Sequence, residues 1–188
     1  MRIIGGEARG RKLFAPPGRV TRPVLDALKE RVFAILGDRA REAVVLDLFC
    51  GPGSFGLEAL SRGAASCTFV DQDRAALDAL GRNLELLHFE PRARVRRGDA
   101  FRLGPALAAD PAASLAFVDP PFPLIERAPH DVAALIDALA ASMQPDARIV
   151  VRVPERFTWP IAPATPTADV RDHGRNRLEL YAPATPSD

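Results

Sequence analysis

The sequence predicts an α/β fold of the doubly wound kind, built around a mostly parallel β-sheet. From residue 44 onward, short apolar runs alternate with segments of helical periodicity, which is typical of strand–helix–strand units. The first apolar run, 44–48, is interrupted only by Asp47 and leads into a turn with Gly51 and Gly53. A buried strand, a glycine turn and a helix start together form the nucleotide-binding corner of such sheets.

An N-terminal extension, residues 1–43, precedes this alternating pattern. Residues 2–14 alternate short apolar pairs with glycines and basic residues, which predicts a small hairpin with a turn or bulge at Gly5-Gly6. Beyond the Pro16-Pro17-Gly18 break, apolar residues at helical spacing predict a helix over 24–36. We expect this extension to pack on the main domain rather than to form a separate one.

Residues 44–182 form the predicted core domain, and 183–188 a flexible tail. The predicted strands are 44–48, 67–71, 93–98, 114–119 and 148–153, followed by a hairpin of 167–173 and 176–182 that turns at Gly174. The predicted helices are 54–62, with Ser54 as its N-cap, 73–87 and 130–142. Residues 104–113 are expected to be a loop with weak helical character, and the proline-rich stretch 154–166 to be irregular. The terminal hairpin would make the sheet mixed.

Composition favours a soluble globular protein that resides in the cytoplasm. Of the 188 residues, 47% are hydrophobic and 26% are charged. No run approaches the ~20 apolar residues of a membrane span, and the N-terminus lacks the apolar segment of a secretory signal. Cys50 and Cys67 have no metal-ligand spacing, so we expect reduced, partly buried thiols and no metal site.

The net charge of +1 hides an asymmetry along the chain. Residues 1–22 contain one acidic residue and six basic residues, which gives this segment a net charge of +5 and leaves −4 for the rest of the chain. The basic residues are Arg2, Arg9, Arg11, Lys12, Arg19 and Arg22. A basic arm on a mildly acidic body indicates a polyanionic partner, although a solvated basic tail would look the same.

Four predicted strands end at or just before an acidic residue: Asp47, Asp71, Asp99 and Asp119. The carboxyl ends of adjacent parallel strands line one crevice, where ligands bind. Asp71 is therefore placed to accept hydrogen bonds from both ribose hydroxyls of a nucleoside-like ligand. Asp99 can accept from an exocyclic adenine amine, and the backbone N–H of Ala100 can serve a ring nitrogen.

The most specific motif in the chain is Asp119-Pro120-Pro121-Phe122. Consecutive prolines stiffen the turn, so the Asp119 carboxylate and the Pro120 carbonyl can accept hydrogen bonds from one planar NH₂ group. Phe122 offers a face for a flat base, a stacking contact worth about 1–3 kcal/mol. This arrangement orients an aromatic amine for attack on a methyl sulfonium by electrostatic positioning. Hydride chemistry has no use for the motif, which argues against a dinucleotide dehydrogenase despite the glycine outline of residues 51–56.

These motifs resemble those of class I S-adenosylmethionine-dependent methyltransferases that act on exocyclic amines. More closely, the chain is similar to the RsmD-like family of bacterial 16S rRNA guanine-N2 methyltransferases. The similarity extends through the N-terminal extension and the core, in the segments Met1-Arg-Ile-Ile-Gly5, Gly10-Arg-Lys-Leu13, Thr21-Arg-Pro23, Leu46-Asp-Leu-Phe49 and Gly56-Leu-Glu-Ala-Leu-Ser-Arg-Gly-Ala64. The chain departs from the family pattern at Cys50 and Pro52 and in the proline-rich stretch.

The resemblance implies a Rossmann-like, seven-stranded sheet of order 3-2-1-4-5-7-6 and methylation of one guanine N2 in 16S rRNA of the small ribosomal subunit or its assembly intermediate. It implies S-adenosylmethionine as cofactor, bound by Asp47, Phe49, Gly51, Gly53, Asp71, Gln72, Asp99 and Ala100. The catalytic residues would be Asp119, Pro120, Pro121 and Phe122. The residues contacting RNA phosphates would be Arg9, Arg11, Lys12 and Arg22. We expect a monomer.

Two alternatives remain open at the level of sequence. One is a methyltransferase for another exocyclic amine, such as adenine N6 of DNA or RNA, although the N-terminal extension leaves little room for a target-recognition region. The other is a non-catalytic RNA-binding assembly factor with the same fold. The intact motif at Asp119 argues against the second, and failure to bind S-adenosylmethionine would support it.

Overall fold

The computed structural model describes residues 1–16, 23–109 and 113–183. Its helices are α1 (Pro23–Leu36), α2 (Ser54–Ser61), α3 (Arg74–Leu87), α4 (Ala100–Ala109), α5 (Phe122–Arg127) and α6 (Pro129–Ser142), with short 3₁₀ turns at Gly37–Ala40 and Glu90–Arg92. Its strands are β1 (Val44–Leu48), β2 (Ser66–Asp71), β3 (Ala93–Arg97), β4 (Leu115–Val118), β5 (Arg148–Pro154), β6 (Thr167–His173) and β7 (Asn176–Tyr181).

The strands form one seven-stranded sheet in the order β3-β2-β1-β4-β5-β7-β6, which confirms the predicted order. The first five strands in this order are parallel, and β7 and β6 add antiparallel pairings at one side. The chain therefore reverses its direction of winding between β1 and β4. In open α/β sheets this switch point is where the crevice for a ligand forms.

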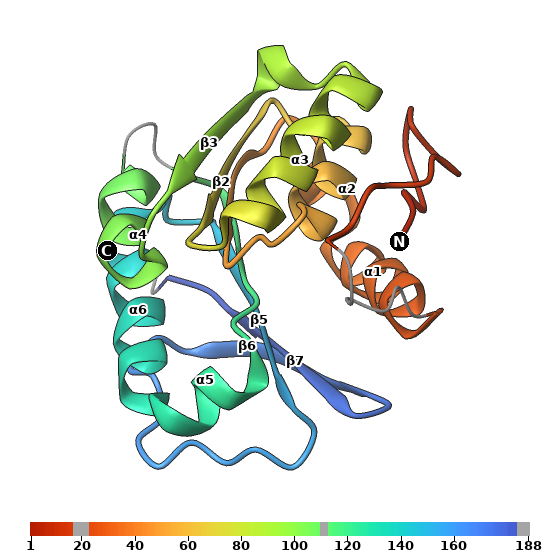
Figure 1. The fold of residues 1–188 in the computed structure, drawn as a ribbon. Coiled ribbons are helices and arrows are strands. Elements are labelled where there is room, and N and C mark those ends of the chain that lie inside the picture. Colours follow the sequence, from red (N-terminus) through yellow and green to blue (C-terminus); the bar gives the residue numbers. More distant parts are fainter. Residues whose placement is uncertain (17–22, 110–112, 184–188) are drawn as a thin grey trace.

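Each face of the sheet is covered by its own layer of helices (Figure 1). Alternate residues of β1 and β4 pack against the two helix layers in turn, because successive side chains along a strand point to opposite faces of the sheet. Val45 and Phe117 belong to the core beneath α1, α2 and α3, whereas Leu46 and Val118 belong to the core beneath α4, α5 and α6. Burial on both faces explains why the strand sequences are almost uniformly apolar.

Helix α4 extends over a stretch expected to be mainly a loop. Gly104 and Pro105 have low helix propensity, yet both lie inside the helix. A Cβ at Gly104 would lie 3.0 Å from Leu48 Cδ1 and 3.1 Å from Leu135 Cδ1, so the glycine allows α4 to approach the sheet and α6 closely. Packing against these neighbours outweighs the weak intrinsic helix propensity.

Helix α5 is a second element that the sequence analysis missed. It begins at Phe122, immediately after the proline pair, and carries Pro123 in its first turn, where a proline loses no helical hydrogen bond. Ile125 is fully buried in the core beneath α4, α5 and α6 and anchors the helix. The rigid turn therefore continues into a helix, which fixes the direction of the chain beyond Asp119.

The N-terminal segment is a hairpin-like arm with a single bridge between Arg2 and Lys12, and its turn lies at residues 7–10. The hairpin does not turn at Gly5-Gly6, where the sequence analysis expected a turn or bulge. Those glycines instead lie against α2, where a Cβ at Gly6 would be 1.7 Å from the carbonyl oxygen of Ser61. The arm thus packs on the core, as expected.

The Glu58 carboxylate, fully buried in α2, holds this arm in place. It accepts hydrogen bonds from the backbone N–H groups of Ile4 and Gly5, both at 2.8 Å. Lys29 Nζ lies 3.3 Å away and Arg62 Nε 2.9 Å away. Burial lowers the pKa of Lys29, an effect that the Glu58 carboxylate opposes. One buried carboxylate therefore ties together the arm, α1 and α2.

Replacing this carboxylate by an amide should strongly destabilise the protein. Glu58→Gln keeps the side-chain shape but leaves Lys29 buried without its counter-charge, which should lower the free energy of unfolding by about 3–5 kcal/mol. Urea unfolding measures the change. Asp172→Asn is the control, because it breaks the solvent-exposed Asp172–Arg177 pair and should change stability by less than about 1 kcal/mol. A similar small change for both variants would contradict the assigned role of Glu58.

Candidate active site

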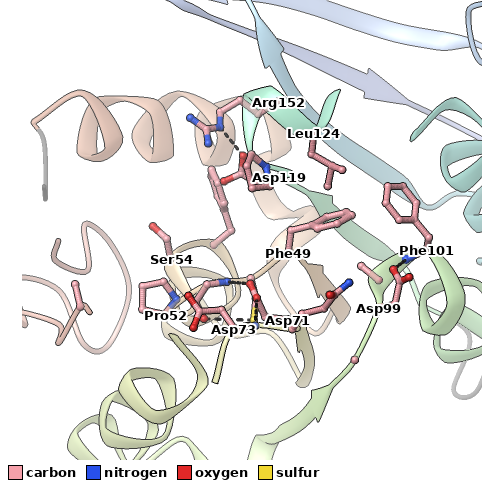
Figure 2. Close-up of a pocket in the computed structure, with 18 of the residues that line it drawn as sticks. Phe49, Pro52, Ser54, Asp71, Asp73, Asp99, Phe101, Asp119, Leu124 and Arg152 are labelled. Carbon is pink, nitrogen blue, oxygen red and sulfur yellow. Dashed lines mark hydrogen bonds and ion pairs between the residues drawn. The ribbon is translucent and has the colours of Figure 1, made fainter. Parts of the chain in front are cut away.

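A cavity of about 820 Å³ opens at the carboxyl ends of β1, β2, β3 and β4. This size suits a nucleoside-sized ligand with room for a second group. Figure 2 shows how the side chains of these strand ends converge on it. The predicted site residues that line it are Phe49, Gly51, Asp71, Gln72, Asp99, Ala100, Asp119 and Pro121. Residues that the sequence analysis did not assign to the site also line it, among them Met1, Ala15, Phe101, Leu124, Arg127 and Arg152.

The turn between β1 and α2 brings backbone close to this cavity. Its residues Phe49, Gly51 and Gly53 have φ values of 57°, 56° and 90°, in the left-handed region. Glycine adopts this region without steric cost, whereas a phenylalanine does so rarely. Phe49 is therefore held in an unusual backbone conformation at the edge of the cavity, which is common at ligand sites.

Gly53, not Ser54, is the N-cap of α2, so the predicted capping role of Ser54 was wrong. The helix therefore begins at Ser54 itself, one residue earlier than it would with Ser54 as the cap. Among the residues that the structure describes, the buried Ser54 hydroxyl has no hydrogen-bond partner. It lies on the cavity wall (Figure 2). A buried hydroxyl without a partner in a cavity is suited to a polar group of a ligand.

Asp47 lies behind the turn and not in the cavity. It is 1% exposed, and its Oδ2 accepts a hydrogen bond from the Gly56 N–H at 2.8 Å. Burial raises the pKa of this carboxyl to about 8, although the hydrogen bond from Gly56 opposes the shift. Asp47 can therefore influence the cavity only through the position of α2 and the turn. Gly53 likewise supports the turn without lining the cavity.

Asp71, at the end of β2, is held by two backbone groups. Its Oδ2 accepts the Gly51 N–H at 2.7 Å, and its Oδ1 accepts the Asp73 N–H at 2.9 Å. Each carboxylate oxygen can accept more than one hydrogen bond. The carboxylate is thus fixed in orientation and keeps further acceptor capacity. Its role as an acceptor for two ribose hydroxyls stays a prediction.

Asp99 and Ala100 follow β3 and begin α4. The Asp99 Oδ1 accepts the Phe101 N–H at 3.0 Å, which orients the carboxylate at the start of the helix. The rings of Phe49 and Phe101 meet edge to face, with their centroids 5.3 Å apart. Together they form an apolar wall beside Asp99 (Figure 2). The signal for Phe101 was an aromatic residue two positions after the predicted acid.

Asp119 lies at the opposite side of the cavity and is paired with an arginine. The Arg152 Nε donates to its Oδ1 at 2.5 Å (Figure 2). Pro120 is buried beneath the turn, whereas Pro121 lines the cavity. Phe122 is half-buried just beyond the lining, and the Arg152 Cζ lies 4.9 Å from the centroid of its ring. The acceptor and the aromatic face predicted for a target base are therefore both in contact with one guanidinium group.

The predicted RNA-binding residues lie on the arm. Arg9, Arg11 and Lys12 are exposed, and Met1 and Ala15 of the same arm line the cavity. Arg22 lies outside the described residues. The arm thus presents positive charge on the segment that forms one wall of the cavity.

No cluster of metal-binding side chains occurs in residues 1–16, 23–109 or 113–183. Both cysteines are free and buried, and burial raises the pKa of each thiol. Across the same ranges, no helix has the length and apolar character that crossing a membrane requires.

A family model described as "Conserved hypothetical protein 95" matches residues 1–182. The chain belongs to this family. Ribosomal RNA small subunit methyltransferase D of Escherichia coli (strain K12) is 43% identical over 122 residues, which cover 65% of this chain and 60% of that protein. The protein of the same name from Haemophilus influenzae is 36% identical over 123 residues, which cover 65% of this chain and 64% of that protein. The matches thus span slightly less than two thirds of each of these curated relatives. The predicted RsmD-like family is confirmed.

Solved structures of this fold extend over nearly the whole chain. The hypothetical protein TTHA0928 of Thermus thermophilus is 29% identical, with a TM-score of 0.77 and coverage of 97% of this chain and 99% of that one. The rRNA methyltransferase aviRa of Streptomyces viridochromogenes has a TM-score of 0.71 and coverage of 92% and 90%, at 20% identity. The latter likeness concerns the fold alone. The family member described here has the Rossmann-like class I methyltransferase fold.

A side chain at Gly56 should disrupt the corner of the site. A Cβ there would lie 2.3 Å from Phe69 Cε1, 2.6 Å from Cys67 Sγ and 2.9 Å from Asp47 Oδ2. Gly56→Ala should therefore lower the free energy of unfolding by about 1–3 kcal/mol, measured by urea unfolding. Gly81→Ala in α3 is the control, because its Cβ meets nothing within 4 Å and should stabilise the helix by about 0.5–1 kcal/mol. If Gly56→Ala raised the free energy of unfolding as Gly81→Ala does, the close contacts of Gly56 would be unimportant.

The raised pKa of Asp47 predicts a specific pH dependence of stability. Its pKa changes from 3.8 to about 8 on folding, so the native state binds more protons between these values. The free energy of unfolding should then fall as pH rises from 4 to 8, by up to about 1.4 kcal/mol per pH unit from this group. Asp47→Asn should remove that component, because an amide accepts from Gly56 without titrating. Parallel stability curves for the two proteins would refute the assignment.

Proposed function

We propose that this protein transfers a methyl group from S-adenosylmethionine to the exocyclic N2 of a guanine in small-subunit rRNA. The observation that carries the proposal is one cavity with two functional sides. Asp71 and Asp99 provide nucleoside acceptors at one side, and Asp119 with its proline turn provides an amine acceptor at the other. The names of the relatives, which are rRNA small subunit methyltransferases, support the choice of substrate.

The residues present fit S-adenosylmethionine. Asp71 would accept from the two ribose hydroxyls and Asp99 from the adenine amine, with the rings of Phe49 and Phe101 beside the base. The unpaired hydroxyl of Ser54 and the left-handed turn suit the amino-acid end of the ligand. When bound, the cofactor supplies an electrophilic methyl group on a sulfonium.

The protein's own residues would position the amine. The Asp119 carboxylate and the Pro120 carbonyl would accept the two N2–H bonds, which turns the nitrogen lone pair towards the methyl group. The new N–C bond would form as the bond between the methyl carbon and the sulfonium sulfur breaks, which leaves a neutral thioether. Positive charge develops on the nitrogen meanwhile, and the nearby carboxylate stabilises it. The methylated amine would then lose one N–H proton to solvent. Asp119 acts here as an electrostatic anchor, and the rigid proline turn preserves its geometry.

The basic arm would bring RNA to this cavity. Arg9, Arg11 and Lys12 would contact phosphates and so position the strand without reading its sequence. The target guanine must be unstacked to reach Asp119, which favours a loop over a regular duplex. Methyl transfer to small subunits and to naked 16S rRNA from cells that lack this modification tests the proposal. Label on a guanine N2 supports it, whereas label on an adenine N6 would favour the alternative amine.

Two variants should separate chemistry from cofactor binding. Asp119→Ala removes the anchor for the amine, so kcat should fall about 100-fold to 1,000-fold while the affinity for S-adenosylmethionine stays within about twofold. Asp71→Ala is the matched comparison, because it removes the ribose acceptor and should weaken cofactor binding at least about tenfold. Calorimetry measures binding, and a labelled-methyl assay measures transfer. Undiminished transfer by Asp119→Ala would rule out its proposed role.

A further inference from the structure

The guanidinium of Arg152 occupies the place predicted for the target base. Its Nε donates to Asp119 Oδ1, and its carbon lies 4.9 Å from the centroid of the Phe122 ring. Nη1 also donates to Asn176 Oδ1 at 3.1 Å. The side chain comes from β5, and Figure 2 shows its contact with Asp119 just beyond the end of β4. An acceptor, an aromatic face and an amide thus hold one flat, NH-bearing group.

A guanidinium has the same arrangement of atoms as one edge of guanine. In both, a planar carbon is bonded to three nitrogens: Nε, Nη1 and Nη2 in arginine, and N1, N2 and N3 in guanine. Both present N–H donors to a carboxylate in the plane and an apolar face to a ring. The amine-bearing carbon of adenine is bonded to only two nitrogens, so adenine matches the guanidinium less well.

The contact between Arg152 and Asp119 is also able to open. Both side chains are 20% exposed, so water can reach the pair. Water that reaches the pair screens its charges and competes for its hydrogen bond, which lowers the free energy needed to separate the two side chains. Arg152 can therefore leave Asp119 when another donor of the same shape arrives.

We infer that Arg152 is a resident mimic of guanine, which fills the target-base subsite until the substrate base displaces it. This inference rests on the proposed function and deepens it, because it assigns a guanine-type edge to the subsite. When Arg152 leaves, its hydrogen bond to Asp119 and its stacking on Phe122 are lost. Only a ligand with similar donors and a flat face restores both contacts, so the subsite favours a guanine-like group. The apparent affinity for the base is reduced by the fraction of molecules in which Arg152 holds the subsite.

Binding of small probes to Arg152→Ala tests the inference directly. The protein is first saturated with S-adenosylhomocysteine, so that probes cannot enter the nucleoside side of the cavity. Methylguanidine should then bind the variant at Asp119 and Phe122 at least about tenfold more tightly than wild type. Guanosine monophosphate should gain about fivefold to tenfold in affinity over wild type, whereas adenosine monophosphate should gain nothing. NMR titration reports both the affinity and the residues contacted.

A matched control removes a different arginine from the same cavity. Arg127 also lines it, so Arg127→Ala makes the same change in charge without vacating the subsite. Methylguanidine should gain no affinity for this variant. Equal gains for both arginine variants, or no gain for Arg152→Ala, would overturn the inference and leave Arg152 as a structural partner of Asp119.

A measurement on wild type covers the case in which Arg152→Ala does not fold. The Arg152 Nε–H signal should be shifted by its pairing with Asp119, and guanosine monophosphate should move it towards the position of a free arginine. A signal that does not change at saturation would refute displacement. In transfer assays, Arg152→Ala should lower KM for the RNA, a change that loss of a purely structural pair would not cause. Methylguanidine binding without methyl transfer to guanine would uphold the subsite and refute the proposed reaction.

Discussion

The contact between Asp47 and Gly56 determines the geometry of the site. The buried carboxyl group of Asp47 accepts the N–H of Gly56 in the first turn of α2, and the missing side chain of Gly56 lets that turn lie against Cys67 and Phe69 of β2. Two strands and a helix are thereby locked at one point, and the left-handed turn between them can only face the cavity. Burying an ionisable group there opposes folding, and the raised pKa of Asp47 shows that burial disfavours its charged form. Asp47 therefore lowers stability locally but fixes the backbone at the site.

The cavity wall also depends on a part of the chain that precedes the core domain. Glu58 holds the start of the arm, and Asn83 of α3 holds its end, accepting from the N–H and donating to the carbonyl of Phe14. The same Asn83 amide donates to the Pro52 carbonyl in the glycine turn at 3.1 Å. The arm and the turn are therefore joined through one buried side chain. The exposed cations of the arm consequently have a fixed position relative to the cavity.

The sequence predicted elements whose signals are local. The ends of the strands were predicted to within one residue. The central strands are buried on both faces and are therefore nearly unbroken apolar runs. Asp71 and Asp99 lie at the carboxyl ends of neighbouring parallel strands, as the strand pattern predicted. Helix α4 was largely missed because Gly104 favours packing that only the assembled layer reveals. The strand order rested on family resemblance, since periodicity does not specify which strands pair. The Asp119–Arg152 pair was not predicted, because the strand order places β5 beside β4 but does not specify which side chains of β5 reach the end of β4.

The electrostatics of the cavity link its two sides. Among the residues that the structure describes, four aspartates and two arginines line it, so the lining is acidic on balance. Each carboxylate at the cofactor side is oriented by backbone N–H groups, which neutralise little charge, whereas Asp119 has a full counter-charge in Arg152. A neutral base that displaces this guanidinium would leave Asp119 without a cation. A sulfonium cofactor in the same cavity would restore positive charge close to that carboxylate. The acidic lining thus suits a cationic cofactor. When that cofactor is present, its positive charge offsets the charge of Asp119 after Arg152 leaves, so the free energy needed to release Arg152 is lower.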